Sequence, residues 1–391
     1  MWERDWASLE RGLLHDVFTR LPADADAASF RHVCRGWRTA AGPGALVPGP
    51  WFVLQSSAAG GHGAFVRPAG RRRVKPVRLD AAKAPVCASR GWLAVEDGGR
   101  LLLREPISRA EFPLPDFEDP EYQDYQLSDI FLSDDPLDAP GRWVAFAFFK
   151  MKHVTYAGHV LAFCRPGDGE WARFDLDGQY AGFYWGLEFF RGRAYVLVGI
   201  SCRIAVCDVD ARTLVASSVT LEHVMEWPWR DAQVHLVECG GDLLAAAVSH
   251  YEDRMPPSCC ARLRRQPRTV GVRVVKVEFA AGGGGAMPVA LSDVEGTGDY
   301  ALFVAPRGHA FALPASGFPA VRPSCVYHFD TNMTTKSASG MIITDLLDHT
   351  PHQHRPLRKL PLAGKWHPLS WFRPRCPSFD TTPARRRWFF A

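Results

Sequence analysis

A short phrase recurs along this 391-residue chain at almost constant spacing: a glycine followed, one to three residues later, by an aromatic residue or leucine. The five glycines are Gly91, Gly141, Gly192, Gly241 and Gly298, so the intervals between them are 50, 51, 49 and 57 residues. Each phrase opens a run of residues that favours a β-strand. The constant spacing indicates that one structural unit is repeated, and each interval has room for a four-stranded sheet.

Runs of strand character cover most of the chain after residue 91. They are residues 92–95, 100–104, 143–150, 159–164, 194–198, 204–209, 234–237, 243–249, 272–279, 300–304 and 325–329. Radial repetition of small sheets leaves few open edges, and the period is close to the roughly 50 residues of kelch repeats. We therefore expect a mainly β fold, a kelch-like β-propeller. A multi-sheet β-sandwich is the alternative, although sandwiches space their turns every 8–12 residues or so.

Both ends of the repeat region offer a further strand. Residues 51–54 precede the first repeat and residues 325–329 follow the last, so together they would complete a closing sheet. The expected organisation is a helical domain at 1–45, the propeller at 51–350 and a basic, Pro-rich C-terminal tail at 351–391.

Composition excludes several classes of protein. Net charge is +4 from 46 basic and 42 acidic residues, which is unlike a histone-type polyanion binder. No run of 18 apolar residues occurs and the N-terminus is polar, so we expect a soluble intracellular protein, cytoplasmic and/or nuclear. Ten scattered cysteines lack zinc-ligand spacing; we expect reduced, mostly buried thiols, no metal and no cofactor. No phosphate loop, Gly-x-Ser-x-Gly elbow or His-Glu-x-x-His motif is present, and no catalytic residue is assigned.

Residues 8–40 have a different, helical pattern. Ser8 suits a helix N-cap, apolar residues then recur at helical spacing, and Pro22 ends the helix. Asp24 or Asp26 suits the cap of a second helix. About 35 residues cannot bury this many large apolar side chains internally. The surplus meets either a partner or the large domain.

The helical segment resembles an F-box. The resemblance rests on Leu9, Leu13, Leu14, Val17, Phe18, Leu21 and Pro22, followed by Phe30, Val33, Cys34, Trp37 and Arg38 in the pattern Phe-Arg-x-Val-Cys-Arg-x-Trp-Arg. It implies that these residues hold the helices together and bind a Skp-type adaptor. Glu10 stands where an F-box usually has proline, which puts the strength of adaptor binding in question.

The remainder resembles plant F-box proteins with a kelch-like associated domain of unassigned function. The matching phrases include residues 91–93, 101–115, 235–244, 274–278, 298–303 and 325–327. The resemblance implies a non-catalytic substrate receptor of a Skp-cullin-F-box ubiquitin ligase, whose propeller recruits a protein target for ubiquitination. Two alternatives remain: a propeller enzyme that binds a small molecule or glycan, and a decayed F-box gene product with little ligase activity.

Charge is segregated along the chain. Ten acidic residues and no basic ones lie between Glu111 and Asp138, whereas residues 254–276 and 355–391 are basic. Solvated loops are the simpler interpretation. The sharper hypothesis is that Tyr122, Asp124, Tyr125 and Asp129 border a surface that binds the target. Two short basic runs, at 71–75 and 385–387, are candidates for nuclear import, whereas nucleic-acid binding and membrane binding are not expected.

Overall fold

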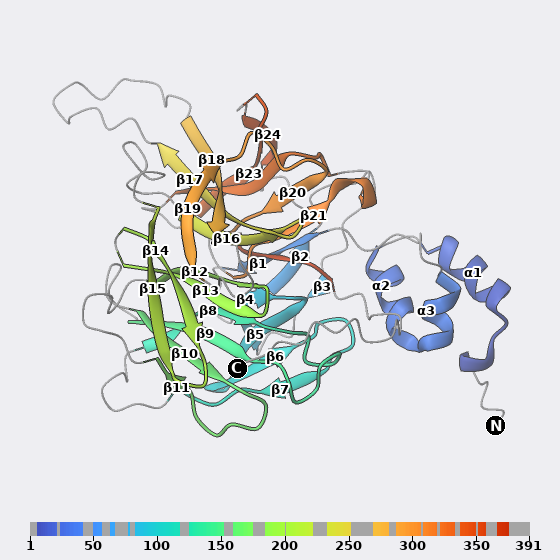
Figure 1. Ribbon diagram of the computed structural model, residues 1–391. Coiled ribbons are helices and arrows are strands. Elements are labelled where there is room, and N and C mark those ends of the chain that lie inside the picture. Colours follow the sequence, from blue (N-terminus) through green and yellow to red (C-terminus); the bar gives the residue numbers. More distant parts are fainter. Residues whose placement is uncertain are drawn as a thin grey trace, which may run out of the picture.

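The computed structural model describes most of the chain. The described residues are 6–21, 24–41, 50–56, 63–66, 77–78, 83–117, 125–151, 159–174, 184–199, 201–221, 233–251, 269–280, 287–305, 308–318, 321–332, 337–348, 351–356 and 366–374. They form a small helical module and a large all-β domain, which Figure 1 shows side by side. The module contains η1 (Trp6–Ser8), α1 (Arg11–Thr19), α2 (Asp24–Val33) and α3 (Arg35–Ala41).

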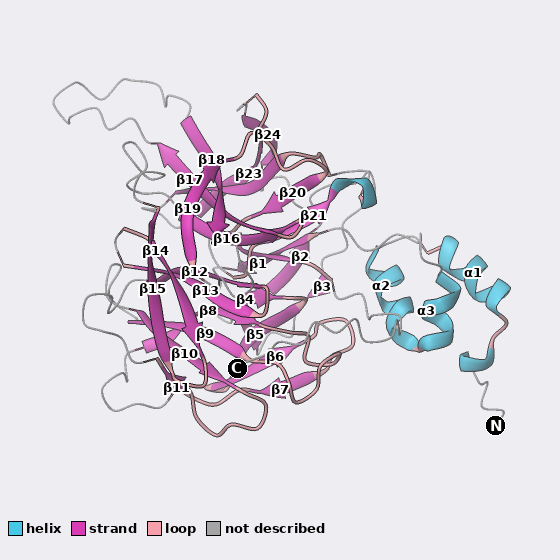
Figure 2. Cartoon of the chain, viewed as in Figure 1, coloured by secondary structure: helices cyan, strands magenta, loops and turns pink. Residues whose placement is uncertain are grey.

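The strands of the described residues form six sheets, which we call blades 1 to 6 (Figure 2). Blade 1 has β1 (Trp51–Ser56), β2 (Gly63–Val66), β3 (Val77–Arg78) and β25 (Trp366–Phe372). Blade 2 has β4 (Lys83–Ser89), β5 (Trp92–Asp97), β6 (Arg100–Arg104) and β7 (Glu111–Pro113), and blade 3 has β8 (Tyr125–Leu132), β9 (Ala145–Met151), β10 (His159–Cys164) and β11 (Ala172–Arg173).

Blades 4 to 6 follow in chain order. Blade 4 has β12 (Tyr184–Phe190), β13 (Arg193–Val198), β14 (Arg203–Asp208) and β15 (Thr213–Thr220), and blade 5 has β16 (Gln233–Cys239), β17 (Asp242–Tyr251), β18 (Thr269–Phe279) and β19 (Pro288–Asp293). Blade 6 has β20 (Tyr300–Phe303), β21 (Phe311–Pro314), the short helix η4 (Ala315–Gly317), β22 (Cys325–Asn332), β23 (Ser337–Asp345) and β24 (Pro351–Pro356).

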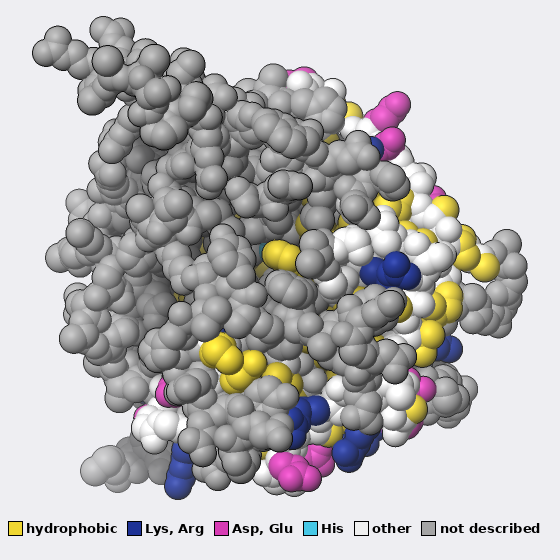
Figure 3. All heavy atoms as spheres, turned by 90° about the vertical axis from the view of Figure 1, so that its left-hand side faces the viewer, with side chains coloured by type: hydrophobic (Ala, Val, Ile, Leu, Met, Phe, Trp, Pro, Cys, Tyr) yellow, Lys and Arg dark blue, Asp and Glu magenta, His cyan; other side chains and the backbone are white. Residues whose placement is uncertain are grey.

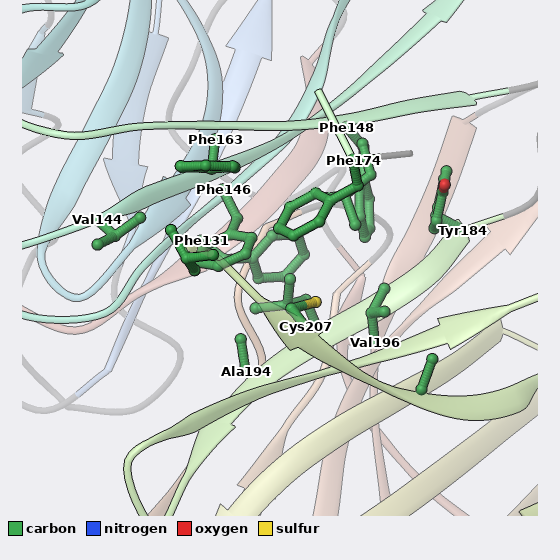
Figure 4. Packing of buried hydrophobic residues seen from close by; sticks show 14 of the residues in the cluster. Phe131, Val144, Phe146, Phe148, Phe163, Phe174, Tyr184, Ala194, Val196 and Cys207 are labelled. Atoms are coloured by element: carbon green, nitrogen blue, oxygen red, sulfur yellow. The ribbon is translucent and has the colours of Figure 1, made fainter. Parts of the chain in front are cut away.

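Six hydrophobic clusters show that the blades form a closed ring, because each cluster combines side chains from two neighbouring blades. Between blades 3 and 4, for example, Phe146 of β9 packs edge-on against Phe189 of β12 with ring centroids 5.5 Å apart. Figure 4 shows this cluster, with Phe146 and Phe148 from blade 3 and Val196 and Cys207 from blade 4. Between blades 6 and 1, Phe303 packs against Trp371 with centroids 5.0 Å apart. The expected β-propeller is therefore present, and the alternative of a β-sandwich is wrong.

The repeated glycines occupy the turns that lead into strands at equivalent places. All five have positive φ, between 61° at Gly298 and 90° at Gly241, a region that glycine enters without steric cost. Gly91, Gly192 and Gly241 each form the second position of a two-residue hairpin loop. The aromatic residue or leucine that follows packs into the sheet, as Trp92 and Leu243 do with no exposed surface. In blades 2, 4 and 5 the period therefore marks the same hairpin, whereas Gly141 lies in the longer connection from β8 to β9 and Gly298 lies between β19 of blade 5 and β20 of blade 6.

The ring closes differently from the expectation. β1 pairs with β25, which comes from the segment assigned to a C-terminal tail, whereas residues 325–329 lie inside β22 of blade 6. β24 also lies in the assigned tail. The boundary at residue 350 was wrong because β25 follows a stretch rich in proline, histidine and basic residues that hides its apolar pattern, Trp366-His-Pro-Leu-Ser-Trp-Phe372.

Five blades place the strands in one order from the centre outward, and blade 6 departs from it. The innermost strands are β25, β4, β8, β12 and β16 in blades 1 to 5. In blade 6, β20 runs parallel to β22 and then turns back into β21, which becomes the innermost strand. The turn between β20 and β21 therefore reaches the centre of the ring. Its last three residues, Gly308–Ala310, are among the described residues.

Candidate functional site

The helical module has a small core of its own. Leu14 and Phe18 of α1, Phe30 of α2, and Ala40 and Ala41 of α3 are buried together. The rings of Phe18 and Phe30 meet edge-on at 5.3 Å, and a hydrogen-bond contact of 3.1 Å between His15 Nδ1 and the Ala40 carbonyl joins α1 to α3. These contacts assign part of the apolar pattern to holding the helices together.

Another part of that pattern points to solvent. Leu13 is 54% exposed, Val17 45% and Val33 53%. Leu13 and Val17 are four residues apart on α1 and therefore share one side of the helix, next to the buried side of Leu14 and Phe18. Of the nine large hydrophobic side chains exposed among the described residues, four lie in the module: Trp6, Leu13, Val17 and Val33. The module thus presents more apolar surface for its size than the propeller does.

The other residues assigned to adaptor binding are divided between these roles. Leu9, Leu21 and Trp37 are half-buried and pack against the module core, and Trp37 donates its indole N–H to the Trp6 carbonyl at 2.8 Å. Cys34 and Arg38 are half-buried. Pro22 lies outside the described residues. The sequence grouped all these residues together, whereas the structure separates packing residues from exposed ones.

Of the four residues assigned to target binding, the structure describes two. Tyr122 and Asp124 lie outside the described residues, and Tyr125 and Asp129 both lie on β8. A β-bulge between Leu127 and Asp129 reverses the side-chain alternation, so Tyr125 packs into the cluster between blades 2 and 3 while Asp129 does not. Oδ1 of Asp129 instead accepts a hydrogen bond from the Gly308 N–H at 2.6 Å.

Where the charged segments are described, their residues mostly pair within the propeller. Arg273 and Lys276 on β18 lie 3.0 Å and 3.1 Å from Asp293 and Asp242. Figure 3 shows described charged side chains of both signs interspersed near the rim of one face. Residues 118–124 of the acidic run and most of the two basic runs fall outside the described residues, so the hypothesis of an acidic binding surface stays a prediction.

A pocket of about 290 Å³ lies at one end of the central channel. It is lined by the C-terminal ends of β4, β16 and β25 with the turns that follow them, by Asp135 and Glu188, and by the start of β21. Its named lining residues are Ala88, Ser89, Arg90, Gly91, Asp135, Glu188, Glu238, His309, Ala310, Phe311, Ala312, Trp371, Phe372, Arg373 and Pro374. All five blades other than blade 6 thus contribute to this site, and the turn before β21 of blade 6 borders it.

Glu188, His309 and Ser89 form a buried polar chain at the floor of this pocket. Nε2 of His309 lies 2.8 Å from Oε1 of Glu188, and Nδ1 lies 3.2 Å from Oγ of Ser89. The chain has the order of a nucleophile-base-acid relay. However, Ser89 Oγ also accepts the Leu132 N–H at 3.0 Å, and the Glu188 carboxylate accepts the N–H groups of Phe189 and Glu238. These hydrogen bonds connect blades 2 to 5 to His309. We therefore assign a structural role to the three linked side chains of Ser89, His309 and Glu188.

Arg90 stands at the edge of the pocket in a fixed position. Its Nε donates to the Leu132 carbonyl at 2.7 Å, and its guanidinium lies over the Phe189 ring at 5.8 Å from the centroid. Its Nη2 lies 4.0 Å from Glu188 Oε1, beyond hydrogen-bond reach. The terminal nitrogens of Arg90 therefore keep donor capacity toward the pocket.

Burial keeps three titratable side chains of the propeller, His235, Cys202 and Cys239, in their neutral forms. Burial lowers the pKa of His235 to about 4, although the Asp129 carboxylate acts in the opposite direction. Burial raises the pKa of the Cys202 and Cys239 thiols to about 12, so both stay protonated at neutral pH. Six of the seven described cysteines are buried, as expected, and none of the described cysteines forms a disulfide.

In the described part of the chain, no helix is long and apolar enough to cross a membrane. No group of three or more His, Cys, Asp or Glu side chains among these residues could hold a metal ion.

Comparison with known proteins identifies the family of the propeller. A model of the KIB1-4 β-propeller matches residues 65–348, which is 284 of the 391 residues. The chain belongs to the KIB1-4 β-propeller family. The match does not cover the helical module. It also leaves out β1 and β25, so the propeller includes residues on both sides of the matched range. No curated protein matches the chain.

Several solved structures resemble the KIB1-4 propeller distantly. The Dos1 propeller is 11% identical with a TM-score of 0.33, covering 78% of this chain and 68% of that one. The dihydro-heme d1 dehydrogenase NirN in complex with DHE is 13% identical with a TM-score of 0.36, covering 84% and 68%. YCF48 from Cyanidioschyzon merolae is 14% identical with a TM-score of 0.32, covering 71% and 87%. At these values we draw no argument about function from them.

The residues that line the channel pocket were not predicted from the sequence. The sequence offers one clue to Arg90: an arginine precedes the repeated glycine twice, as Arg90-Gly91 and Arg191-Gly192. The structure shows that the two arginines occupy equivalent positions, since both have φ of 48°. Glu188, Glu238 and His309 carry no such signal, since they come from three different blades and meet only through the ring closure.

Proposed function

We propose that the chain is a substrate-recognition subunit of a Skp-cullin-F-box ubiquitin ligase, in which the helical module binds a Skp-type adaptor and the KIB1-4 propeller recruits a protein target. Ubiquitin transfer itself then belongs to other subunits, and the chain acts in the cytoplasm, the nucleus or both.

One observation carries the proposal: the F-box-like positions include both a packed core and an exposed apolar set. Phe18 and Phe30 are buried at 8% and 4% exposure, whereas Leu13 and Val33 are more than half exposed. Exposed apolar side chains on a small helical module are stabilised when a partner covers them. Adaptor docking would bury this set without changing the core.

The departure from the F-box pattern at Glu10 is compatible with the proposal. Glu10 is the N-cap of α1, and its carbonyl accepts the Leu14 N–H at 3.0 Å, so the helix begins normally without proline at this position. A carboxylate at the N-terminal end of a helix also interacts favourably with the helix dipole. The substitution therefore leaves the exposed residues of α1 in place.

The test is co-purification of the full chain with a co-expressed Skp-type adaptor. Leu13→Asp and Val17→Asp each place a charge in the exposed apolar set, and we expect each to reduce adaptor recovery at least about tenfold. Thr19→Asp is the matched control, because Thr19 is exposed on another side of α1 and its substitution leaves Leu13 and Val17 unchanged. Unchanged recovery in both Leu13→Asp and Val17→Asp would falsify adaptor binding through this surface.

Trp37→Ala is a weaker test than the sequence suggests. Trp37 packs against Phe30 with ring centroids 4.6 Å apart and donates to the Trp6 carbonyl, so its removal loosens the module itself. A loss of adaptor in that variant has to be compared with its helix content by circular dichroism. The exposed positions Leu13 and Val17 separate docking from folding.

A further inference from the structure

The channel pocket contains two opposite charges that do not satisfy each other. Arg90 and Glu238 both line it, yet no ion pair within 4.0 Å joins them in the described residues. No described residue gives the Glu238 carboxylate a hydrogen bond or ion pair, whereas the other carboxylates are engaged: Glu188 by His309, and Asp135 by the Trp92 indole N–H at 3.3 Å. Arg90 and Arg373 are the two arginines that line the pocket, and the Nη2 of Arg90 lies 4.0 Å from Glu188. The pocket therefore offers a ligand the terminal nitrogens of Arg90 and the carboxylate of Glu238.

Arg90 is held ready for a carboxylate. The bond from Nε to the Leu132 carbonyl and the stacking on Phe189 fix the plane of the guanidinium, while its terminal nitrogens stay available. A planar guanidinium fixed in this way matches the two oxygens of a carboxylate and loses little side-chain freedom on binding. A purely anionic ligand is disfavoured, because the Glu238 carboxylate lines the same pocket.

The third element of the pocket is an apolar wall. Ala310, Phe311 and Ala312 line one side, and Phe311 keeps part of its ring exposed although it stacks on Phe303 at 5.3 Å. A volume of about 290 Å³ is at the lower end of the range for small-molecule sites. It admits a compact ligand and excludes a folded peptide segment.

We infer that this pocket binds a free α-amino acid with an apolar side chain, with its carboxylate on Arg90, its ammonium group on Glu238 and its side chain against Phe311. A zwitterion gives the Glu238 carboxylate a cation and gives the terminal nitrogens of Arg90 a carboxylate closer than that of Glu188, which lies 4.0 Å away. Neither an acid nor an amine does both. This inference does not depend on adaptor binding, since every residue in it belongs to the propeller.

The experiment is isothermal titration calorimetry of the full chain with L-phenylalanine and L-leucine. Three further probes remove one feature each: 3-phenylpropanoate lacks the ammonium group, 2-phenylethylamine lacks the carboxylate, and glucose presents hydroxyl groups alone. We expect saturable binding of at least one amino acid, about 10- to 100-fold weaker binding of its single-charge analogue, and no binding of glucose.

Glu238→Gln tests the site directly, because it removes a charge without breaking a hydrogen bond within the described structure. We expect it to weaken binding of the amino acid by the same factor, while Glu170→Gln, at an exposed position away from the pocket, leaves binding unchanged. Thermal unfolding without ligand confirms that both variants are folded. The inference is overturned if neither amino acid binds at millimolar concentration, if Glu238→Gln binds as tightly as the wild type, or if glucose binds equally well.

Discussion

The backbone N–H of Gly308 donates a hydrogen bond to Oδ1 of Asp129 at 2.6 Å, although 179 positions separate the two residues. The next residue, His309, donates its own N–H to the Ala88 carbonyl at 2.9 Å and reaches Glu188 with its ring. The end of one turn of blade 6 is thus bonded to blades 2, 3 and 4. In this propeller the ring is held together at its centre by polar contacts as well as by the apolar clusters between blades.

Asp129 should therefore contribute to stability more than a typical carboxylate. Asp129→Ala leaves the buried Gly308 N–H without its acceptor and also removes the acceptor of the Ser128 hydroxyl. Because bonds to charged groups are worth more than neutral ones, we expect the free energy of unfolding to fall by about 2–3 kcal/mol. Urea denaturation measures this change. Glu170→Ala is the exposed control, and an equal effect in both variants would contradict the assignment.

Gly308 is required for space as well as for conformation. Its φ is +82°, and a Cβ there would lie 2.6 Å from the Ala88 carbonyl oxygen and close against Ser370. We expect Gly308→Ala to lower the free energy of unfolding by about 3 kcal/mol or more, because the clash adds to the conformational cost. Gly141→Ala is the matched control: φ is +77°, and nothing lies within 4 Å of the added Cβ.

For Gly141→Ala only the conformational cost of about 1 kcal/mol remains. Thermal unfolding of the two variants side by side measures the difference. If the two glycines proved equally replaceable, the close approach of Gly308 to β4 and β25 would not matter to the fold.

The innermost strands show where sequence reasoning failed and why. The expected strands at residues 92–95, 194–198 and 243–249 are the second strands of their blades and alternate regularly. β4, β8 and β12, which line the channel, were not expected. Each contains a register shift, at Pro85/Cys87, Leu127/Asp129 and Tyr184/Leu187. A bulge breaks the two-residue period on which strand prediction depends, so these strands read as loops.

His235 on β16 gives the propeller a calculable dependence on pH. Burial lowers its pKa from the ordinary 6.5 to about 4, so between these values the unfolded chain binds a proton that the folded chain does not. Neutral His235 costs the folded protein nothing above pH 6.5, and the free energy of unfolding falls as pH falls from 6.5 toward 4, because protons then bind the unfolded chain preferentially. From pH about 7 to about 5, we expect the wild type to lose about 2 kcal/mol more than His235→Gln.

Urea denaturation at the two pH values measures this difference. The comparison with His235→Gln cancels the contribution of the carboxylates, which titrate in both proteins. Parallel losses in the two proteins would show that His235 is protonated in the folded state at ordinary pH values and would contradict its burial.

In the helical module, neighbouring residues should have opposite effects. Phe18→Ala removes a ring from the small core and is expected to cost about 3 kcal/mol or more, which a module of this size cannot absorb. Val17→Ala removes an exposed side chain and should leave the module intact. Amide hydrogen exchange over residues 11–41 distinguishes the two: we expect loss of protection in Phe18→Ala alone. Loss in Val17→Ala would mean that Val17 packs internally.

That partition could be anticipated only in part. The helical period of Leu14 and Phe18 predicts a shared face, and the same period equally groups Leu13 with Val17. Which pair faces inward depends on where α2 and α3 pack, and that is set by Phe30 and by the short alanines Ala40 and Ala41. The pattern identified the right residues, and tertiary contacts divided them.

The closing strand β25 provides the last prediction. Leu369, Trp371 and Phe372 are buried, and Trp371 donates its indole N–H to the Val304 carbonyl at 2.9 Å. The strand contributes to two clusters, between blades 6 and 1 and between blades 1 and 2. A chain that ends at residue 356 would leave one edge of β1 unpaired and both clusters open, so we expect it to lose its cooperative thermal transition or to aggregate.

A chain that ends at residue 374 keeps β25 and is the matched control, with a transition expected close to that of the full chain. Because β25 joins only at the end of the sequence, a synthetic peptide of residues 366–374 should be able to add to the open edge of β1 as a separate strand. Recovery of the transition on adding the peptide, and no recovery with a peptide in which both Trp371 and Phe372 are replaced by serine, would show that side-chain burial closes the ring. An unchanged transition in the chain ending at 356 would show instead that the other strands of the propeller hold together without β25.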